Sequence, residues 1–393
     1  MSETVDLRPR IAELADQCVK CGLCVPLCPT YRVANTEAES PRGRIAFAQA
    51  LASGAFEPSH TMIEHLDRCL ACMTCERVCP SHVRYGELIV DTRNLLRESA
   101  EKNPLRWMEL LVRYPALLRW MLRIVNAPII RAISRARIVR EAPRLPAMPT
   151  FAPMKTTPTS RGRVALFLGC VASIADRDVH ASTKRLLTAL GYDVIVPRDQ
   201  GCCGALALHN GNVAGCEKTN ASTRQAFIAA NVDTVLVSAS GCFGTMRDHV
   251  LKGSNCRVRE IHEFLQNDAS IDHLIFKPLP NRIALHTPCT QANVARADEA
   301  VFRLLTRIPA IDIVKLPQEP RCCGAAGDYF LRHPHMSDAL RTQKLDQTLA
   351  IEPDILVTSN VGCRVFLDNG LNLRAQSIEV THPIVLLARQ LQN

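Results

Sequence analysis

Two short cysteine runs near the start of the chain carry its clearest chemistry. Each has the spacing C-x2-C-x2-C-x3-C followed by proline, the first at residues 18–29 and the second at residues 69–80. This spacing wraps three thiolates around one corner of a [4Fe–4S] cube. Because such a cluster carries electrons one at a time, the two runs predict a redox function.

The fourth cysteine of each run is expected to ligate the other cluster, an exchange that goes with this spacing when a protein holds two clusters. One predicted ligand set is Cys18, Cys21, Cys24 and Cys79. The other is Cys69, Cys72, Cys75 and Cys28. A single C-x2-C pair would often bind zinc, but two identical four-cysteine runs favour iron. Disulfides are disfavoured because no secretory segment is visible.

Eight further cysteines fall into two matched sets. The first set is Cys170, Cys202, Cys203 and Cys242, and the second is Cys289, Cys322, Cys323 and Cys363. Each adjacent pair precedes a glycine, Gly204 or Gly324, which permits a turn that lets both thiols face one centre. Each set could hold an iron–sulfur cluster or zinc. Buried inert cysteines or a vicinal disulfide are the alternatives. Cys216 and Cys256 lie outside the pattern and are expected to be free thiols.

These matched sets belong to an internal repeat with an offset of 119 to 121 residues. Residues 163–170 match 282–289, residues 201–207 match 321–327, and residues 232–242 match 352–363. The repeat indicates a duplicated domain. Apolar strands alternating with helices predict parallel sheets, whose carboxyl ends would carry Cys170, Cys242, Cys289 and Cys363. We expect Gly191 and Gly370 to end helices.

Helices are expected to support the first two cysteine runs. One is predicted over residues 11–17 and another over residues 87–103. A third lies between the runs, with Ser40 as its N-cap and Gly54 beyond its end. Arg42 and Arg44 fall in its first turn, where the helix dipole disfavours cations. They are either solvated or directed at a cluster or at a partner's acidic group.

Residues 104–146 form a basic segment with nine arginines against Glu109 and Glu141. Prolines divide it into short helices, and it contains Trp107 and Trp120, the only tryptophans of the chain. Three interpretations stay open: helices packed on the core with arginine stems along their surface, a partner-protein docking site, or a membrane-surface anchor. Residues 147–160 are predicted to be a linker.

Other features limit the possible functions. No apolar run is long enough to span a membrane, and the start of the chain resembles no signal peptide, so we expect a cytoplasmic protein, with peripheral attachment to the inner face of the membrane as a possibility. No dinucleotide fingerprint or P-loop is present, so bound NAD or flavin is not expected, and neither is a nucleic-acid partner. His209, His286 and His382 have structural roles or donate protons to a quinone or substrate.

The whole pattern resembles a known family. The stretches at residues 40–54, 65–88 and 322–334 are similar to the iron–sulfur subunit of glycolate oxidase, and the resemblance covers essentially the full chain. Less closely, the chain resembles the corresponding subunit of anaerobic glycerol-3-phosphate dehydrogenase, with an echo in residues 381–391. The cysteine-rich repeats, here called CCG domains after their Cys-Cys-Gly motif, resemble those of heterodisulfide reductase.

This resemblance implies a non-flavin subunit of an oxidoreductase, inactive on glycolate alone. It would take electrons from FAD-containing dehydrogenase subunits that oxidise glycolate to glyoxylate and pass them toward the quinone pool. The eight cysteines of the first two runs carry over as ligands of two [4Fe–4S] clusters. In the heterodisulfide reductase pattern each CCG domain ends in C-x2-C, and here Ala239 and Asn360 replace the first cysteine. The departure puts that enzyme's unusual double cluster in doubt.

The predicted fold is α+β overall. A mainly helical two-cluster ferredoxin-like domain (1–100) would precede the basic segment and linker (101–160), followed by two α/β CCG domains at 161–275 and 276–393. The alternative functions are an electron-transfer subunit of a lactate or anaerobic glycerol-3-phosphate dehydrogenase, and a thiol/disulfide reductase with a CCG centre as its active site.

Overall fold

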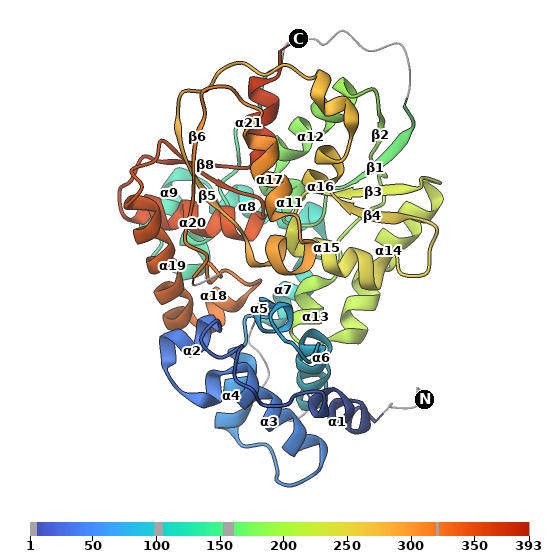
Figure 1. Cartoon of the computed structure of the whole chain (residues 1–393), viewed down its shortest axis with the longest axis vertical. Coiled ribbons are helices and arrows are strands. Elements are labelled where there is room, and N and C mark those ends of the chain that lie inside the picture. Colours follow the sequence, from blue (N-terminus) through green and yellow to red (C-terminus); the bar gives the residue numbers. More distant parts are fainter. Residues whose placement is uncertain (1–5, 98–104, 152–160, 320–321, 393) are drawn as a thin grey trace.

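A computed structural model of the chain describes residues 6–97, 105–151, 161–319 and 322–392. Figure 1 shows a helical N-terminal domain at the bottom and two α/β units side by side above it. Over residues 6–97 the N-terminal domain forms the helices α1 (Arg8–Asp16), α2 (Pro29–Ala34), η1 (Glu37–Glu39), α3 (Pro41–Ala52), α4 (His60–Asp67), α5 (Thr74–Arg77) and α6 (Tyr85–Leu96).

The helices of the N-terminal domain enclose a small apolar core. Ile11 and Leu14 of α1 are fully buried and pack with Leu66 of α4 and Leu88 of α6. Ser40 caps α3 as predicted, because its hydroxyl accepts a hydrogen bond of 2.9 Å from the backbone N–H of Gly43. The core therefore holds the segments on either side of both cysteine runs.

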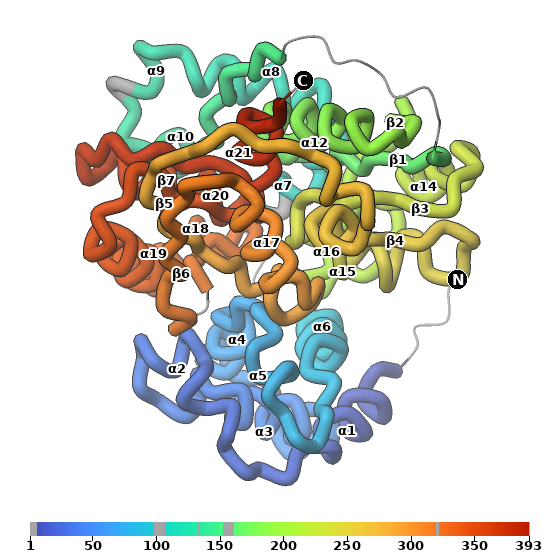
Figure 2. The backbone as a smooth tube through the Cα atoms, turned by 45° about the horizontal axis from the view of Figure 1, so that its top comes forward, coloured from blue at the N-terminus to red at the C-terminus, as the bar shows by residue number. Residues whose placement is uncertain are grey.

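The basic segment forms four short helices: α7 (Arg106–Leu111), α8 (Pro115–Val125), α9 (Pro128–Ile133) and α10 (Arg137–Arg140). Pro115 and Pro128 stand at the first turns of α8 and α9, where a missing N–H costs nothing. In Figure 2, α8 and α9 lie at the top of the molecule and the N-terminal helices at the bottom.

The first CCG domain has a four-stranded parallel sheet in the order β2-β1-β3-β4. Its strands are β1 (Arg163–Phe167), β2 (Asp193–Ile195), β3 (Thr234–Val237) and β4 (Arg257–Glu260). The helical elements between and after them are α11 (Ala172–Ala175), α12 (Arg177–Ala189), α13 (Ala205–His209), α14 (Val213–Ala229), α15 (Ser240–Thr245), η2 (Met246–Val250), α16 (Ile261–Gln266) and η3 (Ala269–His273).

The second CCG domain repeats this topology, with a parallel sheet in the order β6-β5-β7-β8. Its strands are β5 (Arg282–His286), β6 (Asp312–Lys315), β7 (Ile355–Thr358) and β8 (Glu379–Thr381). Its helical elements are η4 (Gln291–Ala295), α17 (Asp298–Leu305), α18 (Tyr329–Arg332), α19 (Pro334–Leu349), α20 (Val361–Leu373) and α21 (Pro383–Gln390). The predicted α+β organisation, with a duplicated parallel-sheet domain, is confirmed.

One apolar core joins the two CCG domains. Leu236 of β3 and Leu186 of α12 pack with Val357 of β7 and Leu386 of α21, all almost completely buried. Such a shared core fixes the two sheets relative to each other. The two cysteine sets are thereby held by one packed unit.

Two local predictions need correction. Gly370 does not end a helix but lies inside α20, where a Cβ would come within 2.8 Å of Leu345 and 2.9 Å of Arg341. Its role is close packing of α20 against α19. The last N-terminal helix begins at Tyr85 rather than at residue 87, and residues 98–103 of the predicted helix lie outside the described residues. Gly191, with φ of +87°, does follow the end of α12 as expected.

Within the described residues, no helix is both long enough and apolar enough to cross a membrane.

Candidate metal centres

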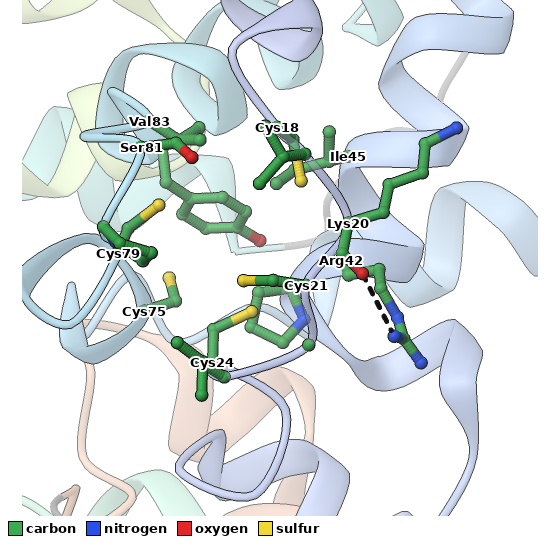
Figure 3. Close-up of a pocket in the computed structure, with 16 residues that line it drawn as sticks. Cys18, Lys20, Cys21, Cys24, Arg42, Ile45, Cys75, Cys79, Ser81 and Val83 are labelled. Atoms are coloured by element: carbon green, nitrogen blue, oxygen red, sulfur yellow. Dashed lines mark hydrogen bonds between the residues drawn. The ribbon is translucent and has the colours of Figure 1, made fainter.

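The first cavity of the N-terminal domain is lined by Cys18, Cys21, Cys24, Cys75 and Cys79. Figure 3 shows their sulfur atoms pointing into one space. The loop after α1 bends tightly here, with positive φ angles of 57° at Lys20 and 83° at Gly22. This bend turns three thiols of the first run toward the same centre.

The second cavity is lined by Cys28, Cys69, Cys72 and Cys75. The backbone between the last three also turns sharply, with positive φ at Ala71 (49°) and Met73 (56°). Each fourth cysteine thus lies at the cavity of the other run, as the predicted exchange requires. Cys75 borders both cavities and marks where they adjoin. The ligand sets themselves stay predictions.

The donors at these two cavities fit clusters rather than isolated ions. Thiols dominate, and thiolates are the ligands of [4Fe–4S] cubes. A cube takes one thiolate at each iron, so its ligands surround a volume instead of converging on a point.

Arg44 is buried beside the second cavity, which overturns the interpretation that it is solvated. Only 1% of it is exposed, and one of its nitrogens lies 3.9 Å from the sulfur of Cys28. Its guanidinium is held by the carboxylate of Glu39 at 2.5 Å and the hydroxyl of Thr30 at 3.0 Å. A permanent positive charge therefore stands next to predicted cluster ligands. Arg42, in contrast, is partly exposed and pairs with Glu37 at 2.6 Å.

Cys69 differs electrostatically from its neighbours. Burial acts to raise the pKa of its thiol, but the guanidinium groups of Arg44 and Arg93 and the hydroxyl of Tyr85 lower that pKa below its usual value. The Tyr85 hydroxyl donates to the Cys69 sulfur at 3.5 Å. Burial instead raises the pKa of Cys72 to about 12. The thiolate form is thus easier to reach at Cys69 than at Cys72. Tyr85 and Arg93 carry no motif, and sequence reasoning missed their role, whereas a place for Arg44 beside a cluster was one of the two interpretations left open.

The cysteines of the first CCG domain come together at the carboxyl end of its sheet. The sulfurs of Cys170 and Cys202 are 3.3 Å apart, and Cys203 contacts Cys242. Cys242 lies in the first turn of α15, just beyond the end of β3. Gly204 has φ of +84°, and a Cβ there would lie 2.7 Å from the sulfur of Cys216.

The second CCG domain has the same arrangement. The sulfurs of Cys323 and Cys363 are 3.1 Å apart, and Cys322 contacts Cys289. Neither adjacent pair, Cys202 with Cys203 or Cys322 with Cys323, is joined by a disulfide in this structure. Asn360 stands where the heterodisulfide reductase pattern has a cysteine, and its amide donates to the Cys363 sulfur at 3.6 Å. Its carbonyl oxygen accepts from the Gly241 backbone at 3.0 Å, which links the two centres.

The second cavity adjoins the second CCG centre. Cys72 shares one apolar cluster with Cys322 and Cys289, together with Leu70 and Tyr329. Three of the four centres defined by cysteines therefore follow one another in space: the first cavity, the second cavity and the centre of the second CCG domain. The centre of the first CCG domain adjoins the last of these through Asn360 and Gly241.

Of the three histidines singled out from the sequence, His286 and His382 are buried and His209 is partly buried. Burial lowers the pKa of His209 to about 4 and that of His286 to about 3, and it lowers that of His382 well below the usual value. His286 is hydrogen-bonded to Thr358 at 2.8 Å, and His382 caps α21. Their surroundings favour structural roles as neutral side chains.

Comparison with known proteins places this arrangement in a family. A 4Fe-4S dicluster domain matches residues 14–83, and a cysteine-rich CCG domain matches residues 164–247 and 283–368. The chain is 30% identical to the glycolate oxidase iron-sulfur subunit of Escherichia coli K12, over 89% of both chains. The chain belongs to the family of glycolate oxidase iron–sulfur subunits.

Two further relatives show the range of this family. A probable glycolate oxidase iron-sulfur subunit of Bacillus subtilis 168 is 29% identical, over 92% of this chain and 90% of its own. Lactate utilization protein A of Geobacillus thermodenitrificans NG80-2 is 24% identical, over 56% of this chain and 96% of its own. The predicted resemblance is confirmed, and the chain is an iron–sulfur protein of oxidoreductase type.

Proposed function

We propose that this chain is the electron-transfer subunit of a glycolate-oxidising complex. It would receive electrons from an FAD-containing dehydrogenase subunit and deliver them to a membrane quinone. Oxidation of glycolate to glyoxylate releases two electrons and two protons, and reduction of a quinone to a quinol consumes the same number. The iron–sulfur clusters, when bound, would accept and release these electrons singly.

The observation that carries the proposal is the continuity of the cysteine centres. The first cavity shares Cys75 with the second, and the second meets the CCG centre of the second domain through Cys72 and Cys322. We propose that the cavities hold [4Fe–4S] clusters with the ligand sets predicted above, and that each CCG set holds a further metal centre. Electrons would then travel from the N-terminal domain into the CCG domains.

A second candidate differs only in the substrate of the partner. The likeness to a lactate utilization protein supports lactate as an alternative 2-hydroxy acid. The substrate would be chosen by the dehydrogenase subunit, since the features argued here concern electron transfer. The proposed role of this chain is the same in both cases.

The test follows cluster reduction by electron paramagnetic resonance in anaerobically prepared protein. We expect glycolate to reduce the clusters only when the flavoprotein subunit is present, with lactate assayed in parallel. Cys79→Ser should remove the signal of the first cluster and Cys28→Ser that of the second. Cys256→Ser serves as the matched control, because Cys256 belongs to neither set. Glycolate turnover by the chain alone, or an iron-free active protein, would contradict the proposal.

A further inference from the structure

The basic segment exposes an unusual number of large apolar side chains. Of the seventeen such side chains that are exposed in the described residues, ten lie between Trp107 and Met148. On α8, Leu117, Trp120 and Ile124 are 47%, 60% and 40% exposed, and their i, i+3, i+7 spacing aligns them in one stripe. Trp107 and Leu110 of α7, and Tyr114 just before α8, are exposed as well. The stripe formed by Leu117, Trp120 and Ile124 is called the α8 face.

The opposite side of α8 anchors the helix firmly. Leu118 and Leu122 are buried and pack against Ala142 and Ile174, with Val171 alongside. Val171 follows Cys170 directly in the chain, so the buried side of α8 is anchored next to the cysteine centre of the first CCG domain. The exposed stripe is thus a fixed part of the molecule, on the side that Figure 2 shows away from the N-terminal helices.

The arginines of the segment divide into two groups. The first group has partners within the protein: Arg131 donates to Asn126 at 2.7 Å, Arg137 pairs with Asp338 at 2.7 Å, and the exposed Arg144 donates to Asn372 at 2.8 Å. A second group is exposed and has no ion-pair or hydrogen-bond partner for its side chains among the described residues: Arg113, Arg119, Arg123, Arg135 and Arg140.

Both acidic residues of the basic segment are buried and bonded to other parts of the protein, so they do not offset the exposed arginines of the segment. The carboxylate of Glu109 accepts hydrogen bonds from Asn210 and Asn212, and that of Glu141 pairs with Arg341 at 2.8 Å. The side chains flanking the apolar stripe, Arg119 and Arg123, therefore keep their charge uncompensated.

We infer that the α8 face rests on an anionic lipid bilayer. A helix that presents an apolar stripe with tryptophan, flanked by arginines, matches the acyl–headgroup boundary in both polarity and charge. No carboxylate of the described chain pairs with Arg119 or Arg123, and anionic lipid headgroups would supply the missing negative charge. The acyl–headgroup boundary would accommodate the apolar side chains. This attachment rests on the proposed function. It would turn the α8 side of the molecule toward the membrane, where the electrons reach a quinone.

Vesicle flotation tests this inference without any electron transfer, so it can fail independently of the proposed function. The full-length holoprotein is mixed with vesicles of phosphatidylcholine alone or with about 30% phosphatidylglycerol. We expect binding to the anionic vesicles, weakened severalfold at high salt because the Debye length falls. Trp120→Glu should lower vesicle binding. The double variant Arg119→Glu/Arg123→Glu should lower it too, by roughly fivefold for each lost cation.

Two exposed residues elsewhere give matched controls. Ile228→Glu alters an exposed apolar residue of α14, and Arg198→Glu reverses an exposed arginine of the first CCG domain. Both should bind vesicles like the unaltered protein, and iron content confirms that every variant is loaded. Equal flotation of face variants and controls would overturn the inference. Failure of the unaltered protein to bind anionic vesicles would also overturn it. In that case, loss of flavoprotein binding in the face variants would identify this surface as a protein-docking site.

Discussion

At the scale of single residues, the cysteines could be predicted and their electrostatic neighbours could not. Spacing alone identifies the two runs, since the ligands of one cluster corner are close in sequence. The position of Arg44 in the first turn of a helix, where cations are disfavoured, left open whether it is solvated or directed at a cluster. Its burial depends on Glu39 and on the backbone of His65, and both contacts arise only from tertiary packing.

Arg44 should raise the reduction potential of the second cluster, because a buried positive charge favours the more negative, reduced state. We expect Arg44→Gln to lower that potential by roughly tens of millivolts while the first cluster changes less. Redox titration monitored by electron paramagnetic resonance measures both. Because breaking a buried ion pair costs about 3–5 kcal/mol, the variant will also be less stable.

Arg44→Lys separates the two effects of this substitution. Lysine keeps the charge but loses the planar fork that reaches Glu39 and Thr30 together. It should restore most of the potential even if stability stays low. Arg84→Gln, an exposed arginine of the same domain, is the control. An unchanged potential in Arg44→Gln would refute the electrostatic role.

At the scale of elements, sequence signals were reliable where a local cause exists. The cap at Ser40 and the turn at Gly191 depend on residues within a few positions, and both occur as predicted. The edge strands β2, β4, β6 and β8 went unpredicted because they are three or four residues long and only partly apolar. Gly370 was misjudged because a glycine needed for helix contact looks the same in sequence as one that ends a helix.

Removal of the Ser40 cap should loosen the helix that carries Arg44. We expect Ser40→Ala to lower the free energy of unfolding by about 1 kcal/mol, because the Gly43 N–H would lose its acceptor. Thermal unfolding of the anaerobic protein gives the difference. Ser53→Ala, at the other end of α3 and exposed, is the matched control and should change little. Equal destabilisation by the two variants would argue against a capping role.

At the scale of the whole molecule, the duplication was predictable but the way its copies pack was not. Arg364 of α20 reaches across to Asp176 and Asp178 of the first CCG domain, with the latter pair at 2.9 Å. His262 and His382 occupy equivalent positions of the repeat, and their rings stack 5.2 Å apart. Such contacts join segments more than a hundred residues apart, so no local pattern predicts them. They make the two domains one unit.

This buried interior should make the protein sensitive to mild acid. Burial lowers the pKa of His180 to about 4, so between pH 6.5 and pH 4 the folded protein binds fewer protons there than the unfolded chain. Stability from this group is therefore complete above pH 6.5 and decreases as the pH falls. His180→Phe should remove about 1 kcal/mol of the stability lost between pH 7.5 and pH 5.5. The exposed His273→Phe is the control, and melting temperatures across this range measure both. Parallel pH profiles for His180→Phe and the unaltered protein would show that His180 does not cause the acid sensitivity.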